Sequence, residues 1–213
     1  TCKLIQPIKG YRKKLLDMAS NNAKTNLLQK FEVMERQNET TEESMRQLAQ
    51  KLRIPGLSRI EIFDNSHISG AFTVAGMVVF EDGLPCKNDY RLFKLHTENS
   101  DVDSMKEVLY RRYFRLLNEG GRFPDLLLVD GGLTQIEAAK EILGSLDLDI
   151  PICGLVKNDK HQTASLMNER LEIVDVEPGS PLFFLLTRMQ DEVHRFAISY
   201  HRKLRQKAQT KSI

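Results

Sequence analysis

One stretch of the sequence, Arg59-Ile-Glu-Ile-Phe-Asp-Asn-Ser-His67, decides how the rest of the chain is interpreted. Its apolar residues alternate up to Phe63, which predicts a buried β-strand, and the run stops abruptly at Asp64. A carboxylate at such a position needs a partner or a metal ion, because an unpaired buried charge is costly. The alternative is a turn-forming Asp that caps the end of the strand. The choice depends on whether other segments bring matching ligands to Asp64.

The composition is that of a globular protein. The chain has 213 residues, 41% hydrophobic and 28% charged, with a formal net charge of +2, which fits one main domain with an extension. No apolar run approaches the roughly 20 residues that span a bilayer, and no signal peptide is recognisable. Cys2, Cys86 and Cys153 have no paired spacing, so we expect no zinc site or disulfide framework and a reducing, cytoplasmic setting. Because the first residue is Thr1, we expect a piece of a longer polypeptide.

An N-terminal helical arm is predicted for residues 1–56. Apolar side chains recur every three or four positions in its first part, which is the pattern of an amphipathic helix. Thr40-Thr41-Glu42-Glu43 resembles a capping box and predicts that a second helix begins there, and Ile54-Pro55-Gly56 predicts its end. We expect the main domain at residues 57–201 and a basic tail or linker at residues 202–213.

The main domain has the element order of a mixed α/β fold. Three strands come first and predict an antiparallel meander, and the later strands alternate with helices. The apolar run Leu126-Leu-Leu-Val129 before Asp130 suits a strand buried on both faces, which is typical of parallel pairing. The predicted elements are strands at 59–64, 73–80 and 87–95, a helix from 101, a strand at 124–130, a helix at 133–146, strands at 151–156 and 171–176, and a helix from 181. This is the order of a ribonuclease H-like fold, a mixed sheet flanked by helices.

Two aspartates would converge in such a sheet. The strands that end in Asp64 and Asp130 lie side by side and parallel in this topology, so their carboxylates meet at one edge. Two neighbouring carboxylates repel each other unless a cation lies between them, and oxygen ligands favour Mg²⁺ or Mn²⁺. A cation at this edge would stabilise the charge that develops on a phosphate during hydrolysis. The alternative is that both residues are turn-forming aspartates.

Two further residues are candidates for the same edge. His194 falls beside the apolar stripe of the last helix at about 100° per residue, and Gln190 and His201 share that edge. Its imidazole would bind a metal or transfer a proton near pH 7, or it is an ordinary boundary histidine hydrogen-bonded to a carboxylate. Asp101, at a helix start, either satisfies free backbone N–H groups or presents its carboxylate to the metal.

Basic residues gather where a phosphate backbone would have to pass. Lysine and arginine contacts to phosphates give affinity without reading the base sequence. A solvated charged surface is the alternative for each of them. The candidates for DNA contact are Arg111, Arg112, Lys157, Lys160, Arg195, Arg202 and Lys203.

Four groups of residues carry a resemblance to a known family. They are Phe63-Asp64-Asn65-Ser66-His67, Asp101 to Met105 with Val108-Leu109-Tyr110-Arg111-Arg112-Tyr113, Leu127 to Gly132 with Gln135, and Asp191-Glu192-Val193-His194-Arg195-Phe196-Ala197 with His201-Arg202. Together they resemble the UvrC family, the incision subunits of the bacterial UvrABC nucleotide excision repair system. The resemblance extends over almost the whole chain.

The resemblance implies a ribonuclease H-like endonuclease domain that makes the 5′ incision beside a DNA lesion, with Mg²⁺ or Mn²⁺ as cofactor. The family's catalytic Asp, Asp and His fall on Asp64, Asp130 and His194, and a further acidic position falls on Asp101. The implied partners are double-stranded DNA that carries a lesion, and UvrB through regions that this chain lacks.

Other segments of the family are not recognisable in this sequence. They are the GIY-YIG nuclease domain, the UvrB-interacting UVR motif and the tandem helix-hairpin-helix module, so we expect weak or nonspecific DNA binding by this chain alone. Two other functions stay open: a ribonuclease H-like nuclease that acts on RNA–DNA hybrids or junctions, and a noncatalytic DNA-binding module with the same fold. The intact Asp, Asp and His set argues against the second.

Overall fold

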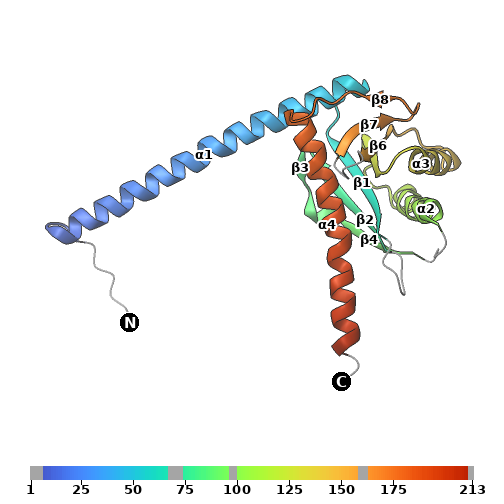
Figure 1. Cartoon of the computed structure of the whole chain (residues 1–213). Coiled ribbons are helices and arrows are strands. Elements are labelled where there is room, and N and C mark those ends of the chain that lie inside the picture. The colour runs from blue at the N-terminus through green and yellow to red at the C-terminus, as the bar shows by residue number, and fades with distance from the viewer. Residues whose placement is uncertain (1–6, 67–73, 96–99, 158–162, 211–213) are drawn as a thin grey trace. The chain divides into compact units, whose positions relative to one another are not determined.

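The computed structural model in Figure 1 describes residues 7–66, 74–95, 100–157 and 163–210. Side chains are described within these ranges except at Ser66, Lys157, Thr163, Ala164 and residues 200–210. The chain divides into two compact units, Thr1–Thr40 and Thr41–Ile213. The domain boundaries predicted from the sequence stay predictions.

Helix α1 spans Tyr11–Leu52 without a break, so the predicted start of a second helix at Thr40 is wrong. The Thr40 hydroxyl donates to the carbonyl of Arg36, four residues back, and therefore bonds inside the helix without capping a new one. In the first unit, apolar side chains of α1 such as Phe31 and Met34 are more than half exposed (54% and 57%). In the second unit, the last turns of α1 bury apolar side chains in the core.

The second unit is built on a mixed sheet, whose described strands follow the order β3-β2-β1-β5-β6-β7-β8, with β4 also paired to β2. The strands are β1 (Arg59–Ser66), β2 (Val74–Glu81), β3 (Leu84–Pro85), β4 (Arg91–Lys94), β5 (Leu126–Asp130), β6 (Ile152–Lys157), β7 (Thr163–Asn168) and β8 (Ile173–Val174). β1 pairs antiparallel with β2 and parallel with β5, and β5 pairs parallel with β6. The predicted mixed α/β fold and the parallel pairing of the strands that carry Asp64 and Asp130 are confirmed, although β1 continues two residues past Asp64 to Ser66. The predicted strand at 87–95 is shorter, because a 3₁₀ turn (η1, Lys87–Asp89) precedes β4.

Helices cover both faces of this sheet (Figure 1). Helices α2 (Asp101–Glu119) and α3 (Leu133–Ser145) pack on one face, and α4 (Pro181–Thr210) packs with the end of α1 on the other. Along β1, Ile60 and Ile62 enter the core beneath α4, whereas Phe63 enters the core beneath α2 and α3. Because both faces are covered, even Glu61 is 0% exposed. None of the helices, within the ranges described, has an apolar stretch long enough to cross a bilayer.

Candidate metal centre

Three polar side chains converge at the edge of the sheet where β1 and β5 end. Asp64 comes from β1, Asp130 from β5 and His194 from α4, and their ligand atoms lie within 4.8 Å of one another. The structure therefore brings together three of the four residues that the sequence predicted for this site, without Asp101. In the described part of the chain, no other group of three histidine, cysteine or acidic side chains has this geometry.

Strand register explains why the two carboxylates meet. β1 and β5 pair in parallel with Phe63 opposite Val129, so the residues that follow, Asp64 and Asp130, reach the same edge. Gly131 comes next with a φ of 149°, and a Cβ at this position would lie 2.7 Å from a side chain of α3. The chain turns sharply from β5 into α3 because this position carries no side chain.

Helix α4 crosses the strand ends and meets a different strand at each turn. The contacts are Ala197 with Gly76 on β2, His194 with Asp64 on β1, and Gln190 with Asp130 on β5. These strands are neighbours in the sheet. Steps of three and four residues advance about 4.5–6 Å along a helix, close to the roughly 4.8 Å between neighbouring strands. The helix repeat thus places one side chain of α4 against each of three strands.

The close approach of α4 depends on Gly76. It lies opposite Asp64 in the β1–β2 register, and a Cβ added to it would lie 3.0 Å from the Cβ of Ala197. Two small residues therefore let the helix lie near the sheet, one turn after His194. At this separation His194 Nδ1 lies 3.1 Å from Asp64 Oδ2. Asp64 is buried, whereas the His194 side chain is 55% exposed. The imidazole ring of His194 therefore lies between the buried carboxylate and solvent.

Gln190 is the residue of this centre to which sequence reasoning assigned no role. Its side chain is buried, and its amide donates a hydrogen bond to Asp130 Oδ1. The signal that was present in the sequence is its place one turn before His194, on the same edge of the helix. That signal does not say which strand end the amide meets, because this depends on how α4 crosses the sheet.

Asp101 lies outside the group of three converging ligands. It is the exposed first residue of α2, and the N-cap is Ser100, whose hydroxyl accepts hydrogen bonds from two backbone N–H groups of the first turn. Asn65, next to Asp64 on β1, donates its side-chain amide to the Asp101 carbonyl at 3.0 Å. This bond ties the start of α2 to the end of β1, and a role of the Asp101 carboxylate stays a prediction.

The residues predicted to contact DNA have different surroundings. Arg195 is exposed and makes three hydrogen bonds to the carboxylate of Glu192 on the same helix. Arg111 donates to the carbonyl of Lys94 at 2.6 Å and also pairs with an acidic neighbour on α2. Lys160 lies outside the described residues, as do the side chains of Lys157, Arg202 and Lys203.

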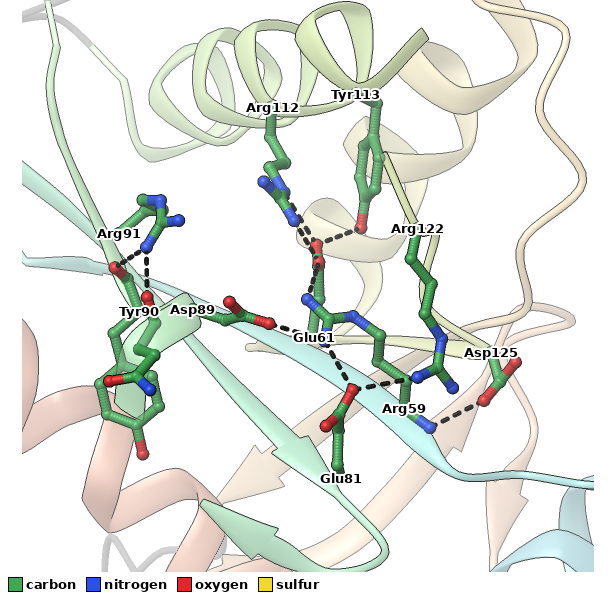
Figure 2. Close-up of polar contacts among 11 residues, drawn as sticks. Arg59, Glu61, Glu81, Asp89, Tyr90, Arg91, Arg112, Tyr113, Arg122 and Asp125 are labelled. Atoms are coloured by element: carbon green, nitrogen blue, oxygen red, sulfur yellow. Dashed lines mark hydrogen bonds and ion pairs between the residues drawn. The ribbon is translucent and has the colours of Figure 1, made fainter. Parts of the chain in front are cut away.

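Arg112 is among the DNA-contact candidates in the sequence, but the structure places it in an ion pair within the fold. Its Nη2 lies 2.6 Å from Oε1 of the fully buried Glu61, and Tyr113 donates its hydroxyl to the same carboxylate. Figure 2 shows Glu61 between these two side chains and Arg59. The sequence does not reveal this role, because an arginine on a helix looks the same whether it faces solvent or a strand.

These residues belong to a larger group of charges on the first half of β1, which we call the arginine network (Figure 2). Its members are Arg59, Glu61, Glu81, Asp89, Arg112, Tyr113 and Arg122. Arg59 Nη1 lies 2.8 Å from carboxylate oxygens of both Glu81 and Asp89. Burial, together with the charge of Glu61, raises the pKa of Tyr113 well above its usual value, so its hydroxyl stays protonated and donates. Each carboxylate of the network therefore lies beside at least one guanidinium group.

The group formed by Asp64, Asp130 and His194 fits a divalent cation. Its two carboxylates repel each other at this separation, and a cation between them would relieve the repulsion. The partners described for them are an imidazole and an amide, which orient the oxygens without requiring a positive charge. Carboxylate oxygens suit Mg²⁺ and Mn²⁺, and imidazole nitrogen is a common metal ligand in proteins.

The chain is similar to known proteins over most of its length. Residues 49–198 match the family model of the UvrC RNAse H endonuclease domain. The chain is 48% identical over 209 residues to UvrABC system protein C of Streptococcus mutans, and 47% identical over 208 residues to that of Oenococcus oeni. The alignments cover 96% and 97% of this chain but 35% and 34% of those proteins, so the chain spans about a third of their length.

Among solved structures, human ENDOV aligns over 74% of this chain and 90% of its own, with 15% sequence identity and a TM-score of 0.40. The family model covers well over half of the chain, and it includes Asp64, Asp130 and His194. The chain therefore belongs to the UvrC family, and residues 49–198 are its RNase H endonuclease domain.

Proposed function

We propose that this chain hydrolyses a DNA phosphodiester with Mg²⁺ or Mn²⁺ and makes the 5′ incision beside a lesion in nucleotide excision repair. The observation that carries the proposal is the convergence of Asp64, Asp130 and His194 within 4.8 Å at one sheet edge. Membership of an endonuclease domain family supports it, as does identity to proteins named UvrABC system protein C. Lesion-bearing duplex DNA as substrate, UvrB as partner and a cytoplasmic location are parts of the same proposal.

Each residue of the centre has a proposed role. Asp64 and Asp130 would hold the ion through their carboxylates, and His194 would be a third ligand or a proton-transfer group. The ion, when bound, would stabilise the negative charge that develops on the phosphate. The hydrogen bond between His194 Nδ1 and the Asp64 carboxylate orients the exposed imidazole, so the ring is able to face a substrate at the sheet edge. Asp101 would support the metal or orient the attacking water from the start of α2.

DNA would pass along the basic surfaces that flank the centre. Arg195 on α4 is exposed and follows His194 directly, which makes it the best-placed described residue for phosphate contact. Arg111 on α2 is a second candidate. Arg112 is left out, because its side chain is only 12% exposed and pairs with the fully buried Glu61, whereas the side chains of Arg111 and Arg195 are 41% and 67% exposed. Lys157, Lys160, Arg202 and Lys203 stay in the proposed set on their sequence positions alone.

The test is Asp64→Asn in the complete repair protein, assayed for 5′ nicking of lesion-bearing duplex DNA with UvrA and UvrB present. We expect incision to be lost while the circular dichroism spectrum is retained. Asp175→Asn, which changes an exposed Asp outside the centre, is the matched control and should nick normally. Normal 5′ nicking by the Asp64→Asn protein would overturn the proposal. Cleavage of RNA–DNA hybrid in preference to damaged duplex would point to a different substrate for the same fold.

A further inference from the structure

Gln190 is a buried polar residue at the centre that the proposed chemistry does not use directly. It is 4% exposed and lies on α4 one turn before His194. Its side-chain nitrogen donates to Oδ1 of Asp130, which is half-buried at the end of β5. Burial of an amide is costly unless its hydrogen bonds are satisfied, so a glutamine at this place needs a specific partner.

We infer that Gln190 is a positioning residue of the metal centre, which holds Asp130 in the orientation required to bind the ion. The inference rests on the proposed function and assigns a residue to it. A carboxylate accepts hydrogen bonds and donates none, so the amide nitrogen of Gln190 must face Oδ1. The amide is neutral, and it therefore fixes the Asp130 side chain while leaving the carboxylate its charge for a cation.

The geometry of α4 gives a reason for a glutamine at this position. The helix offers one side chain to each carboxylate, with His194 on Asp64 and Gln190 on Asp130. The step of four residues from Gln190 to His194 spans about 6 Å of helix, close to the spacing of neighbouring strands. The partner of Asp130 must therefore stand one turn before the histidine. Groups that orient metal ligands typically change metal affinity or activity by about 10–100-fold when they are removed.

The experiment replaces Gln190 with Met, which has a similar length and no donor. Binding of Mn²⁺ to the 213-residue chain without DNA is followed by electron paramagnetic resonance of the free ion, with Asp64→Asn in parallel. We expect Gln190→Met to weaken Mn²⁺ binding by roughly 10-fold or more, with an unchanged circular dichroism spectrum. In the complete protein, the Mn²⁺ concentration for half-maximal nicking should rise by a similar factor, whereas nicking at saturating Mn²⁺ should fall less.

Thr187→Val is the matched control, because it removes a hydrogen bond internal to α4 one turn before Gln190, at a half-buried position. It should bind Mn²⁺ like the parent chain. If Gln190→Met does not fold, Gln190→Asn keeps a buried amide but is one methylene too short to reach Asp130, and the same loss of affinity is expected. The positioning role is overturned if Gln190→Met binds Mn²⁺ within twofold of the parent while Asp64→Asn does not bind it. Where Gln190→Met misfolds, the same result for Gln190→Asn overturns the role. In either case the proposed function survives. If Asp64→Asn binds as tightly as the parent, the proposed metal site itself fails.

Discussion

Strand β1 contributes residues to two groups of charged side chains, and the carboxylates of the two groups have different partners. The arginine network, at residues 59 and 61 of the strand, sets three arginines against three carboxylates. The metal centre begins three residues later at Asp64 and sets two carboxylates beside an imidazole and an amide. Both groups include a residue that is at least 95% buried, since Glu61 is 0% and Asp64 is 5% exposed. Burial alone therefore does not distinguish them.

The difference lies in the partners. In the arginine network, Glu61 is held by guanidinium groups whose charge it balances, and a buried pair of this kind is satisfied within the fold. At the metal centre, the structure describes the imidazole of His194 as a partner of Asp64 and the amide of Gln190 as a partner of Asp130. A carboxylate paired with arginine serves the structure, whereas two neighbouring carboxylates beside an imidazole suit a cation.

The largest effect is expected at Glu61. Glu61→Gln removes the charge between Arg59 and Arg112 and leaves both guanidinium groups with a weaker partner. We expect the free energy of unfolding to fall by about 3–5 kcal/mol, the usual cost of breaking a buried pair from one side. At about 2–4 °C per kcal/mol for a chain of this size, the midpoint of thermal unfolding should fall by roughly 10 °C. Urea and thermal unfolding of the metal-free chain measure both values.

The control for Glu61 is the double variant Glu61→Leu with Arg112→Leu. It replaces both main charges by apolar groups of similar volume, and such replacements recover much of the lost stability. An unchanged unfolding midpoint in Glu61→Gln would show that the arginine network contributes no stability, and the contrast with the metal centre would be lost.

The second prediction concerns the stability of the metal centre. Addition of Mn²⁺ at 100 times its dissociation constant should stabilise the parent chain by about 2.7 kcal/mol, because the ion binds the folded state. Asp64→Asn should abolish this gain. Without metal, Asp64→Asn should be at least as stable as the parent, since it relieves the repulsion with Asp130. Thermal unfolding with and without Mn²⁺ gives both results, and a metal-free Asp64→Asn chain as unstable as Glu61→Gln would contradict the distinction.

The third prediction concerns the distance between α4 and the sheet. Gly76→Ala places a Cβ 3.0 Å from the Cβ of Ala197 and 3.3 Å from its Cα, so the helix must move away by a few tenths of an ångström. We expect nicking to fall about tenfold, because small displacements of catalytic groups are costly, with a loss of stability of about 1 kcal/mol from overpacking. Nicking rates and unfolding midpoints of the variant measure the two effects.

Ala197→Gly is the second-site test for Gly76→Ala. The double variant restores the space and should recover most of the nicking, although glycine inside a helix costs about 1 kcal/mol of stability. Gly144→Ala, on α3, has no atom within 4 Å of the added Cβ and is the matched control with unchanged nicking. If the double variant nicks as poorly as Gly76→Ala alone, the contact with Ala197 does not position His194.

The sequence predicted the parts of this fold that depend on local patterns. The apolar runs before Asp64 and Asp130 specified two buried strands, and their parallel pairing followed from the order of elements. The edge position of His194 followed from the helix repeat. These features need only a strand period, a helix period and a topology.

The features that the sequence did not reveal depend on packing between elements. Glu61 alternates with isoleucines and resembles a residue on a solvated face, but helices cover both faces and bury it against Arg112. Gln190 resembles any boundary residue until the crossing of α4 places it on Asp130. Thr40 matched a capping box, yet its hydroxyl bonds within a continuous helix. In each case the local pattern is compatible with two environments, and tertiary contacts select one.

The smallest effect is expected at Asp89, on the rim of the arginine network. The hydrogen bond from Arg59, at 2.8 Å, lowers the pKa of the Asp89 carboxyl below its usual value, while partial burial opposes the change. Because the pKa is lower in the folded than in the unfolded state, this pair stabilises the fold above the unfolded value of about 3.9 and stops doing so as the pH falls through the folded value. The side chain is 37% exposed, so the contribution after screening by solvent should stay below about 1 kcal/mol.

Asp89→Asn tests the charge pairing of the network without disturbing its buried core. The variant should be less stable than the parent at pH 7, and the difference in free energy of unfolding should shrink as the pH falls below about 4. Urea unfolding from pH 7 to pH 3 measures this difference, with Asp175→Asn as a control on an exposed carboxyl outside the network. A difference that stays constant over this range would mean that Asp89 acts through shape and not through charge. Asp89, at the rim of the network, would then stabilise the fold as an ordinary packed side chain. The contrast between charge pairing in the arginine network and the metal centre would depend on Glu61 alone.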